Sequence, residues 1–203
     1  MKIKTFVFDL GNVLLPFDYS IMIKKLNAIS DNLGNSYYRW YRDNYHYHRD
    51  FEKGLIKEEE FIELNLKVLD NRISAETFCR FYSEIFEENR KITSLLPIIK
   101  NNFNLILLSN TNSIHKKYGW DKYNFITYFD HLVLSHIVKS VKPEKEIYEY
   151  AQSLSNSQPD EILYIDDIKE YTDAAEKLGW NTYHFINEDD TFEFLQKKLK
   201  AAK

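Results

Sequence analysis

The sequence predicts an α/β protein whose core is a parallel sheet of five strands, with an all-helical part inserted after the first strand. Short apolar runs typical of buried strands occur at residues 4–8, 105–109, 131–135, 162–166 and 181–185. Segments of helical pattern separate the last four runs, which is the rhythm of βαβ units in a parallel sheet. The first two runs are separated by the long interval 9–104, which is too long for a loop in a compact domain.

The long interval predicts an all-helical insertion over residues 17–91. Apolar residues recur at helical spacing at Phe61, Leu64 and Val68, behind a run of glutamates that favours the first turn of a helix. Ser74 is placed to be the N-cap of a further helix over 75–86. A helix around 95–101 then returns the chain to the sheet. We therefore expect a core domain formed by 1–16 and 92–203, and a helical domain formed by 17–91.

Size and charge exclude several classes of protein. A chain of 203 residues can bury one sizeable α/β core. The net charge of −4 and the sequence pI of about 5.9 imply no general affinity for nucleic acid or anionic membranes. The single cysteine, Cys79, rules out an internal disulfide. Because the amino terminus runs directly into a predicted strand, we expect neither a signal region nor a membrane-spanning stretch. We expect a soluble, cytoplasmic protein, and a monomer by default.

The first strand is followed by an aspartate, Asp9, and then by Gly11. In open α/β sheets, ligands bind at the carboxyl ends of the strands. A carboxylate at that edge can act as a nucleophile toward phosphorus or carbon, although an isolated aspartate there would more often cap the following turn. Gly11 has two compatible interpretations, a tight turn and room for a ligand to approach the backbone.

The fourth strand ends in an acid pair, Asp166-Asp167. Paired carboxylates repel each other unless a cation lies between them, and Mg²⁺ takes one or two carboxylates while keeping water and phosphate oxygens in its shell. The alternative is that the pair caps the helix beginning near Glu170. The presence of Asp9 on another strand makes the metal interpretation stronger.

Two further polar segments follow strands. Lys142 precedes Pro143, which disfavours helix at the lysine and suits the first position of the next helix. A lysine held in this way can neutralise a phosphate or neighbouring carboxylates, whereas most lysines are solvated surface residues. Ser109-Asn110 ends the second strand and offers a hydroxyl and backbone N–H groups to an anion, or forms only a turn.

Taken in order, these four segments resemble the four motifs of the haloacid dehalogenase superfamily, which has a Rossmann-like core. The insertion resembles the C1-type helical cap of that superfamily. The segments 9–13, 51–56 and 109–112 look closest to bacterial phosphatases acting on α-glucose 1-phosphate and to the amino-terminal phosphatase domain of soluble epoxide hydrolases.

The resemblance implies a Mg²⁺-dependent phosphatase acting on a small phosphorylated metabolite such as a sugar phosphate. Asp9 would attack phosphorus to form an aspartyl-phosphate, which water then hydrolyses, with Ser109 and Lys142 as further catalytic residues. The phosphate would be bound by Ser109, Asn110 and Lys142. The ligands of Mg²⁺ would be Asp9, the carbonyl of Gly11, Asp167, and Asp166 either directly or through water.

The sequence departs from the superfamily pattern at Gly11, where most of its phosphatases carry a second aspartate as general acid and base. We expect a cap residue or an ordered water to protonate the leaving oxygen, and Asp18 is the nearest acid in the sequence. A smaller departure is Tyr171, with Glu170 before it, where relatives often have asparagine.

Two other functions stay open. A 2-haloacid dehalogenase also lacks the second acid, but those enzymes need no metal and carry uncharged residues in place of Asp166-Asp167. A non-catalytic protein that binds a phosphorylated ligand could have lost turnover together with the acid. In the cap, aromatic residues with Arg39, Arg42, His46 and His48 suggest a small polar phosphoester, although both histidines are expected on an exposed helical surface.

Overall fold

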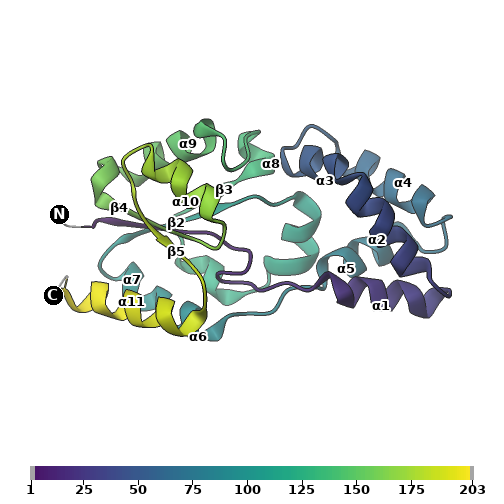
Figure 1. The fold of residues 1–203 in the computed structure, drawn as a ribbon, viewed down its shortest axis with the longest axis horizontal. Helices are drawn as coiled ribbons and strands as arrows, with labels where there is room; N and C mark the ends of the chain where they lie inside the picture. The colour runs from purple at the N-terminus through teal and green to yellow at the C-terminus, as the bar shows by residue number, and fades with distance from the viewer. Residues whose placement is uncertain (1–2, 202–203) are drawn as a thin grey trace.

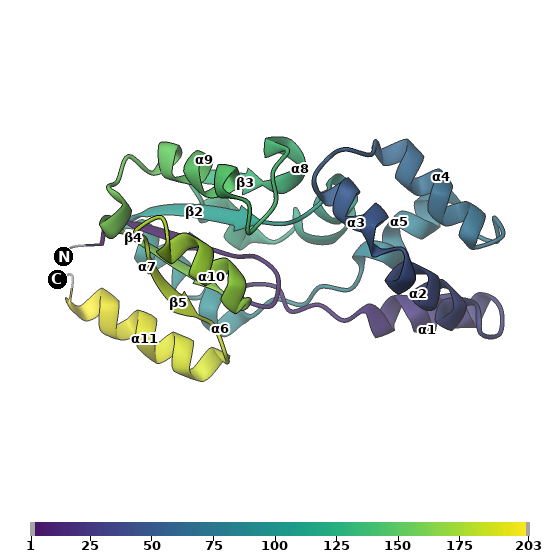
Figure 2. The same cartoon turned by 45° about the horizontal axis from the view of Figure 1, so that its top comes forward.

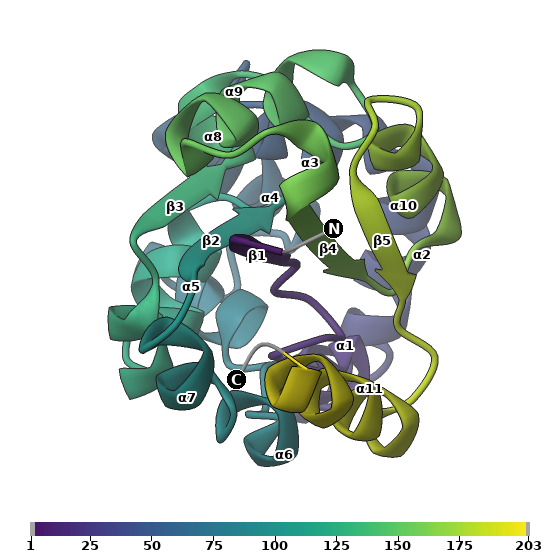
Figure 3. The same ribbon diagram turned by 90° about the vertical axis from the view of Figure 1, so that its left-hand side faces the viewer.

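The core of the protein is a parallel sheet of five strands in the order β3-β2-β1-β4-β5, seen end-on in Figure 3. The computed structural model describes residues 3–201. Its strands are β1 (Thr5–Phe8), β2 (Asn104–Ser109), β3 (His131–Leu134), β4 (Ile162–Asp166) and β5 (Asn181–His184). The predicted Rossmann-like α/β architecture is confirmed, and each strand bound lies within one residue of its prediction.

Helices cover both faces of the sheet (Figure 1). One face carries α6 (Arg90–Thr93), α7 (Leu96–Lys100) and α11 (Glu188–Ala201). The other carries α9 (Lys145–Ser155) and α10 (Lys169–Glu176), with the short α8 (Ser135–Val138) directly after β3. Short helical turns, η1 (His115–Trp120), η2 (Asn124–Tyr128) and η3 (Pro159–Glu161), lie in the connections.

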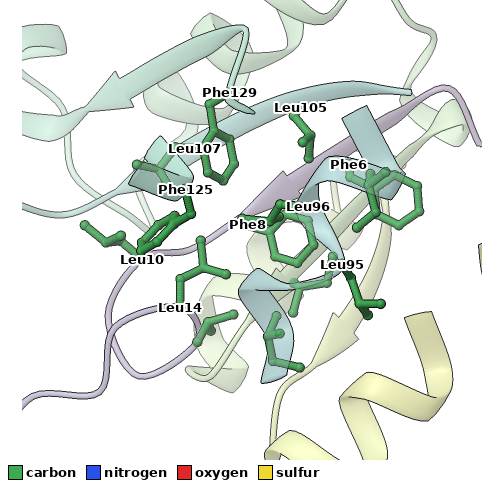
Figure 4. Close-up of a cluster of buried hydrophobic side chains, with 14 of the residues drawn as sticks. Phe6, Phe8, Leu10, Leu14, Leu95, Leu96, Leu105, Leu107, Phe125 and Phe129 are labelled. Atoms are coloured by element: carbon green, nitrogen blue, oxygen red, sulfur yellow. The ribbon is translucent and has the colours of Figure 1, made fainter. Parts of the chain in front are cut away.

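Strand residues alternate between these two layers because successive side chains of a strand point to opposite faces. Phe6 and Phe8 of β1 pack with Leu96 in the cluster drawn in Figure 4. Val7, between them, packs with Tyr148 of α9 on the opposite face. All of these side chains are fully buried. Burial of each contributes roughly 1.5–3 kcal/mol to folding, so β1 is held firmly and the residue that follows it has a defined position.

The segment between β1 and β2 begins with five helices that gather beyond the carboxyl ends of the strands (Figures 1 and 2). They are α1 (Tyr19–Ile29), α2 (Leu33–Asp43), α3 (Tyr45–Glu52), α4 (Glu58–Val68) and α5 (Ala75–Ser83). Their buried side chains, which include Met22, Phe51, Phe61 and Phe78, form a hydrophobic cluster of their own. We refer to these five helices as the cap.

The chain crosses between the sheet and the cap along two paired segments. The N–H of Asp18 donates to the carbonyl of Ile85 (3.0 Å), and the N–H of Glu87 donates to that of Pro16 (2.9 Å). Because of this antiparallel pairing, α5 ends at Ser83. The helix predicted over 75–86 is therefore too long by the residues 84–86. Ile85 and Phe86 continue the helical pattern in the sequence, but in the structure they belong to the segment that connects the cap to the core.

A second seam joins the loop after α3 to the core. The ammonium of Lys139 donates to the carbonyl of Gly54 (2.7 Å), and Lys53 pairs with Glu144 (2.7 Å). These contacts hold α3 over the carboxyl edge of the sheet. No helix within residues 3–201 combines the length and the apolar character that a membrane crossing requires.

Candidate active site

Three carboxylates meet at the carboxyl ends of the two central strands. Asp9 follows β1 and Asp166 ends β4, and the pairing of Phe8 with Ile165 sets the two acids side by side. The N–H of Asp9 donates to the carbonyl of Ile165 (2.9 Å). Asp167 comes next in the chain, and one oxygen from each of the three carboxylates lies within 4.8 Å of the others.

Lys142 lies among these carboxylates. Its Nζ donates to Asp9 Oδ1 and to Asp166 Oδ2, both at 2.6 Å, and the side chain is 1% exposed. The backbone N–H of Lys142 donates to Asn110 Oδ1 (2.8 Å), and the amide of Asn110 donates to the carbonyl of Lys142 (3.2 Å). Lys142 is therefore a buried counter-ion rather than a solvated surface lysine.

The charges at this edge are not balanced by the protein alone. Burial raises the pKa of Asp9 to about 8; Lys142 lowers it, but Asp166 and Asp167 add to the rise. Burial also raises the pKa of Asp167, against a hydrogen bond from Asn12. Three carboxylates facing one ammonium leave room for a divalent cation, and carboxylate oxygens are the ligands that Mg²⁺ prefers.

The two inner acids have different surroundings. Asp166 is fully buried; besides Lys142 it accepts from the N–H of Ile168 (2.8 Å) and from the hydroxyl of Tyr164. Asp167 lines the cavity described below and accepts from the amide of Asn12 (3.0 Å). Asp166 thus holds Lys142 and the turn before α10, whereas Asp167 faces the open space.

A cavity of about 360 Å³ opens in front of this edge, between the sheet and the cap. On the core side it is lined by most of the residues that the sequence singled out, namely Asp9, Gly11, Ser109, Asn110, Lys142, Asp167 and Tyr171. Asp166 lies directly behind them, in contact with Lys142. The structure therefore brings all of the predicted nucleophile, phosphate and metal residues to one place.

The cap side of the cavity was only partly predicted. It is lined by Tyr19, Tyr38, Tyr41, Arg42, Tyr45, His48, Arg49 and Glu52. The prediction that His48 lies on an exposed surface is wrong. Its ring is buried, and its two nitrogens contact Tyr82 Oη (2.7 Å) and Glu52 (3.2 Å). The spacing of His48 and Glu52, one helical turn apart, is the signal that could have indicated the pair.

The other residues considered in the cap and beside it lie outside the cavity. His46 and Arg39 are exposed, and neither lines it. Asp18 is exposed and caps α1, where its carboxylate accepts from the N–H of Ser20 (2.8 Å). The hydrogen bonds from Ser20 lower the pKa of Asp18, so this side chain is a poor proton donor. Glu170 is also exposed.

Comparison with known sequences gives one family match. Residues 3–179 match the family described as hydrolase, haloacid dehalogenase-like hydrolase. A D-ribitol-5-phosphate phosphatase of Bacteroides thetaiotaomicron is 26% identical over 93% of this chain and 94% of its own. A phosphorylated carbohydrates phosphatase of Thermotoga maritima is 22% identical over 90% of this chain and 86% of its own.

Comparison with solved structures gives matches of the same kind. The crystal structure of a HAD family enzyme from Bacteroides thetaiotaomicron superposes with a TM-score of 0.84 and 26% identity, over 96% of this chain and 99% of the other. The same enzyme in complex with magnesium and inorganic phosphate superposes with a TM-score of 0.75 and 26% identity, over 90% and 93% of the two chains.

Proposed function

The chain belongs to the haloacid dehalogenase-like hydrolase family, and on that premise we propose that it is a Mg²⁺-dependent phosphatase acting on a small phosphorylated carbohydrate. The observation that carries the proposal is the arrangement of Asp9, Asp167 and Lys142 on the wall of one cavity. The names of the relatives, which are phosphatases of ribitol 5-phosphate and of phosphorylated carbohydrates, support it. The narrower resemblance to α-glucose 1-phosphate phosphatases stays a prediction.

In the proposed reaction Asp9 is the nucleophile. One of its carboxylate oxygens forms a bond to phosphorus while the bond from phosphorus to the carbohydrate oxygen breaks, and the electron pair leaves on that oxygen, which takes up a proton. Water then attacks the phosphorus of the aspartyl-phosphate and restores Asp9 with release of inorganic phosphate. Lys142 Nζ, already 2.6 Å from Asp9 Oδ1, would neutralise charge on the phosphoryl oxygens, and the hydroxyl of Ser109 would donate a hydrogen bond to one of them.

Asn110 has a supporting part in this proposal. Its amide is bonded to both the N–H and the carbonyl of Lys142, so it fixes the backbone from which the lysine extends. It also lines the cavity, where its amide can reach a phosphate. We therefore propose Asn110 as a phosphate-binding residue that also positions Lys142.

The residues present fit a magnesium ion. Asp9, Asp167 and the carbonyl of Gly11 would hold it, with Asp166 bound directly or through water. When bound, Mg²⁺ supplies positive charge that neutralises the phosphate and favours the ionised form of Asp9. The raised pKa of Asp9 means that the nucleophile is poorly ionised at neutral pH until such a cation is present.

Because residue 11 is glycine, no aspartate at this position can protonate the oxygen of the leaving group. General acid catalysis is typically worth about a hundred- to ten-thousand-fold, so phosphoesters with poor leaving groups should be turned over slowly unless water or a cap residue supplies the proton. Asp18 does not meet this need, because it caps α1 outside the cavity.

The test is phosphate release from p-nitrophenyl phosphate and a panel of sugar and alditol phosphates, with Mg²⁺ and with EDTA. We expect release that requires Mg²⁺ and that Asp9→Asn abolishes. Asp18→Asn is the matched control, because it makes the same change at an exposed cap and should keep both the rate and the pH profile.

Other outcomes would replace the proposal. Tight binding of inorganic phosphate without turnover of any phosphoester would mean that the protein is a binding protein. Release of halide from 2-chloropropionate without added metal would favour a dehalogenase, for which the acid pair Asp166-Asp167 is unsuited.

A further inference from the structure

The cap contributes one buried carboxylate to the cavity, that of Glu52 at the end of α3. The residue is 7% exposed and lines the cavity together with Asp9. Glu52 Oε1 lies 3.2 Å from His48 Nε2, and Oε2 lies 3.4 Å from a guanidinium nitrogen of Arg49. The phosphatase reaction proposed above makes no use of this group.

Glu52 is held in its charged form. Burial alone would raise its pKa, but pairing with His48 and Arg49 lowers it below the ordinary value. An ionised carboxylate has about four positions for accepted hydrogen bonds. Within residues 3–201 the structure gives each oxygen one side-chain partner. Glu52 therefore keeps acceptor capacity toward the cavity and offers no proton of its own.

The carboxylate is also tied to the phosphate end of the cavity. The other terminal nitrogen of Arg49 donates to the carbonyl of Lys142 (2.9 Å), which also accepts from the amide of Asn110. Behind Glu52, the ring of His48 is bonded to Tyr82 Oη (2.7 Å). The position of Glu52 relative to the proposed phosphate site is thus set by a continuous series of polar contacts, through Arg49 to the backbone carbonyl of Lys142.

Aromatic rings complete this part of the wall. The rings of Tyr41 and Tyr45 lie 5.3 and 5.2 Å from the ring of His48, centroid to centroid, and both line the cavity. Aromatic faces next to a carboxylate that can still accept hydrogen bonds suit a ligand with both C–H surfaces and hydroxyl donors. A carbohydrate has this chemistry. A second phosphate or a carboxylate on the ligand would meet the negative charge of Glu52.

We propose that Glu52, positioned by His48 and Arg49, binds hydroxyl groups of the carbohydrate and thereby selects polyhydroxylated monophosphates over other phosphoesters. This inference rests on the proposed phosphatase function. It places selectivity in the cap and assigns Glu52 as the residue that determines it.

The test compares two ligands of equal chain length, ribitol 5-phosphate and n-pentyl phosphate, which lacks the hydroxyls. We expect the wild type to prefer ribitol 5-phosphate in kcat/KM, and Glu52→Gln to reduce that preference about 10- to 100-fold, the effect of losing a hydrogen bond to a charged group. Glu59→Gln, on the exposed side of α4, is the matched control and should keep the wild-type preference.

Binding without turnover separates this inference from the proposed function. In an Asp9→Asn background, calorimetry with ribitol 5-phosphate reports the cap contact, and calorimetry with inorganic phosphate reports the core site. Adding Glu52→Gln should weaken the binding of ribitol 5-phosphate by the same factor and should weaken the binding of inorganic phosphate much less. An unchanged preference in the folded variant would overturn the inference even if phosphatase activity is found.

If Glu52→Gln fails to fold, Glu52→Asp takes its place, because it keeps the charge and withdraws it by one methylene. A preference intermediate between those expected for wild type and for a chain without the carboxylate supports the inference. Two results together would overturn it. Glu52→Asp would keep the full wild-type preference in kcat/KM, and the Asp9→Asn protein would bind n-pentyl phosphate as tightly as ribitol 5-phosphate.

Discussion

Replacing Lys142 by methionine should destabilise the metal-free protein in a way that depends on pH. Methionine keeps most of the apolar stem of the side chain and removes the ammonium, with its charge and its two hydrogen bonds. Lys142 is 1% exposed and makes two contacts of 2.6 Å, to Asp9 and to Asp166, whose side chains are 10% and 0% exposed. Without the ammonium, these two buried carboxylates would face each other with no positive side chain between them.

The expected loss is large because removing one partner leaves buried charge uncompensated. Breaking a buried ion pair in this way costs about 3–5 kcal/mol, which for a chain of this size corresponds to a fall in melting temperature of roughly 6–20 °C. Lys145→Met is the matched control. Lys145 forms a pair with Glu149 on the surface of α9, and such pairs contribute no more than about 1 kcal/mol.

The sign of the pH dependence follows from Asp9. Its pKa is about 8 in the folded protein against an ordinary value of 3.8 for a solvated aspartate, so the folded state holds a proton that the unfolded state loses between these values. The contribution of this carboxyl to the free energy of unfolding therefore falls as the pH rises from about 4 to about 8. Loss of the lysine should raise the pKa of Asp9 further, so in Lys142→Met the fall should continue above pH 8, where it levels off in the wild type. Lys142→Met should therefore lose more relative to wild type at about pH 9 than at about pH 6.

Urea unfolding in EDTA at about pH 6 and about pH 9 measures both losses, and repeating it with Mg²⁺ shows whether a cation can replace the ammonium. We expect Mg²⁺ to recover part of the loss at about pH 9. Equal losses at the two pH values would refute the electrostatic reasoning and leave lost packing as the cause.

Three further predictions follow from the same site and its supports. The apparent affinity for Mg²⁺ should rise about tenfold per pH unit between pH 5 and 7 and level off above 8, because binding must displace the proton of Asp9; calorimetry in two buffers measures the released proton, and a pH-independent affinity would contradict this. Gly11→Asp should raise the turnover of n-pentyl phosphate relative to p-nitrophenyl phosphate about tenfold or more, since only the poorer leaving group needs an acid; Gly11→Asn is the control, and an equal gain there would argue against proton donation. Gly34→Ala should cost about 1–3 kcal/mol, because a Cβ would lie 2.2 Å from the carbonyl of Ile23; urea unfolding beside Asn35→Ala measures it, and wild-type stability would show that α1 and α2 separate freely.

The core of the fold was predictable because its central strands, β1, β2 and β4, are buried on both faces. Such a strand appears in the sequence as a short apolar run, independently of its neighbours. β1 is followed by Asp9, and β4 has Asp166 as its last residue. Parallel pairing then brings both acids to one edge without any knowledge of the loops. The order of strands and polar residues along the chain was enough to place this half of the site.

Helix ends and the cap surface were harder to predict because distant contacts decide them. Ile85 and Phe86 continue the helical pattern of α5, yet their segment pairs with residues 16–18. Phe51 buries its side chain beside Phe61, and with it α3 is oriented so that His48 and Glu52 turn inward. Nothing in the local sequence of α3 distinguishes that inward face from a solvated one.

This difference in predictability matches a division of labour in the molecule. The groups proposed to act on phosphate lie at the ends of buried strands, where the backbone leaves little freedom, and the same arrangement can serve any phosphoester. The groups proposed to contact the rest of the substrate lie on α3, which reaches the core through a few polar contacts such as that of Arg49 with Lys142 (2.9 Å). Substitutions on α3 can therefore change which carbohydrate is bound while Asp9 and its neighbours stay in place. By the same reasoning, exchanging α3 side chains should shift substrate preference at nearly constant phosphate affinity, whereas any change at Lys142 should reduce activity toward all phosphoesters alike.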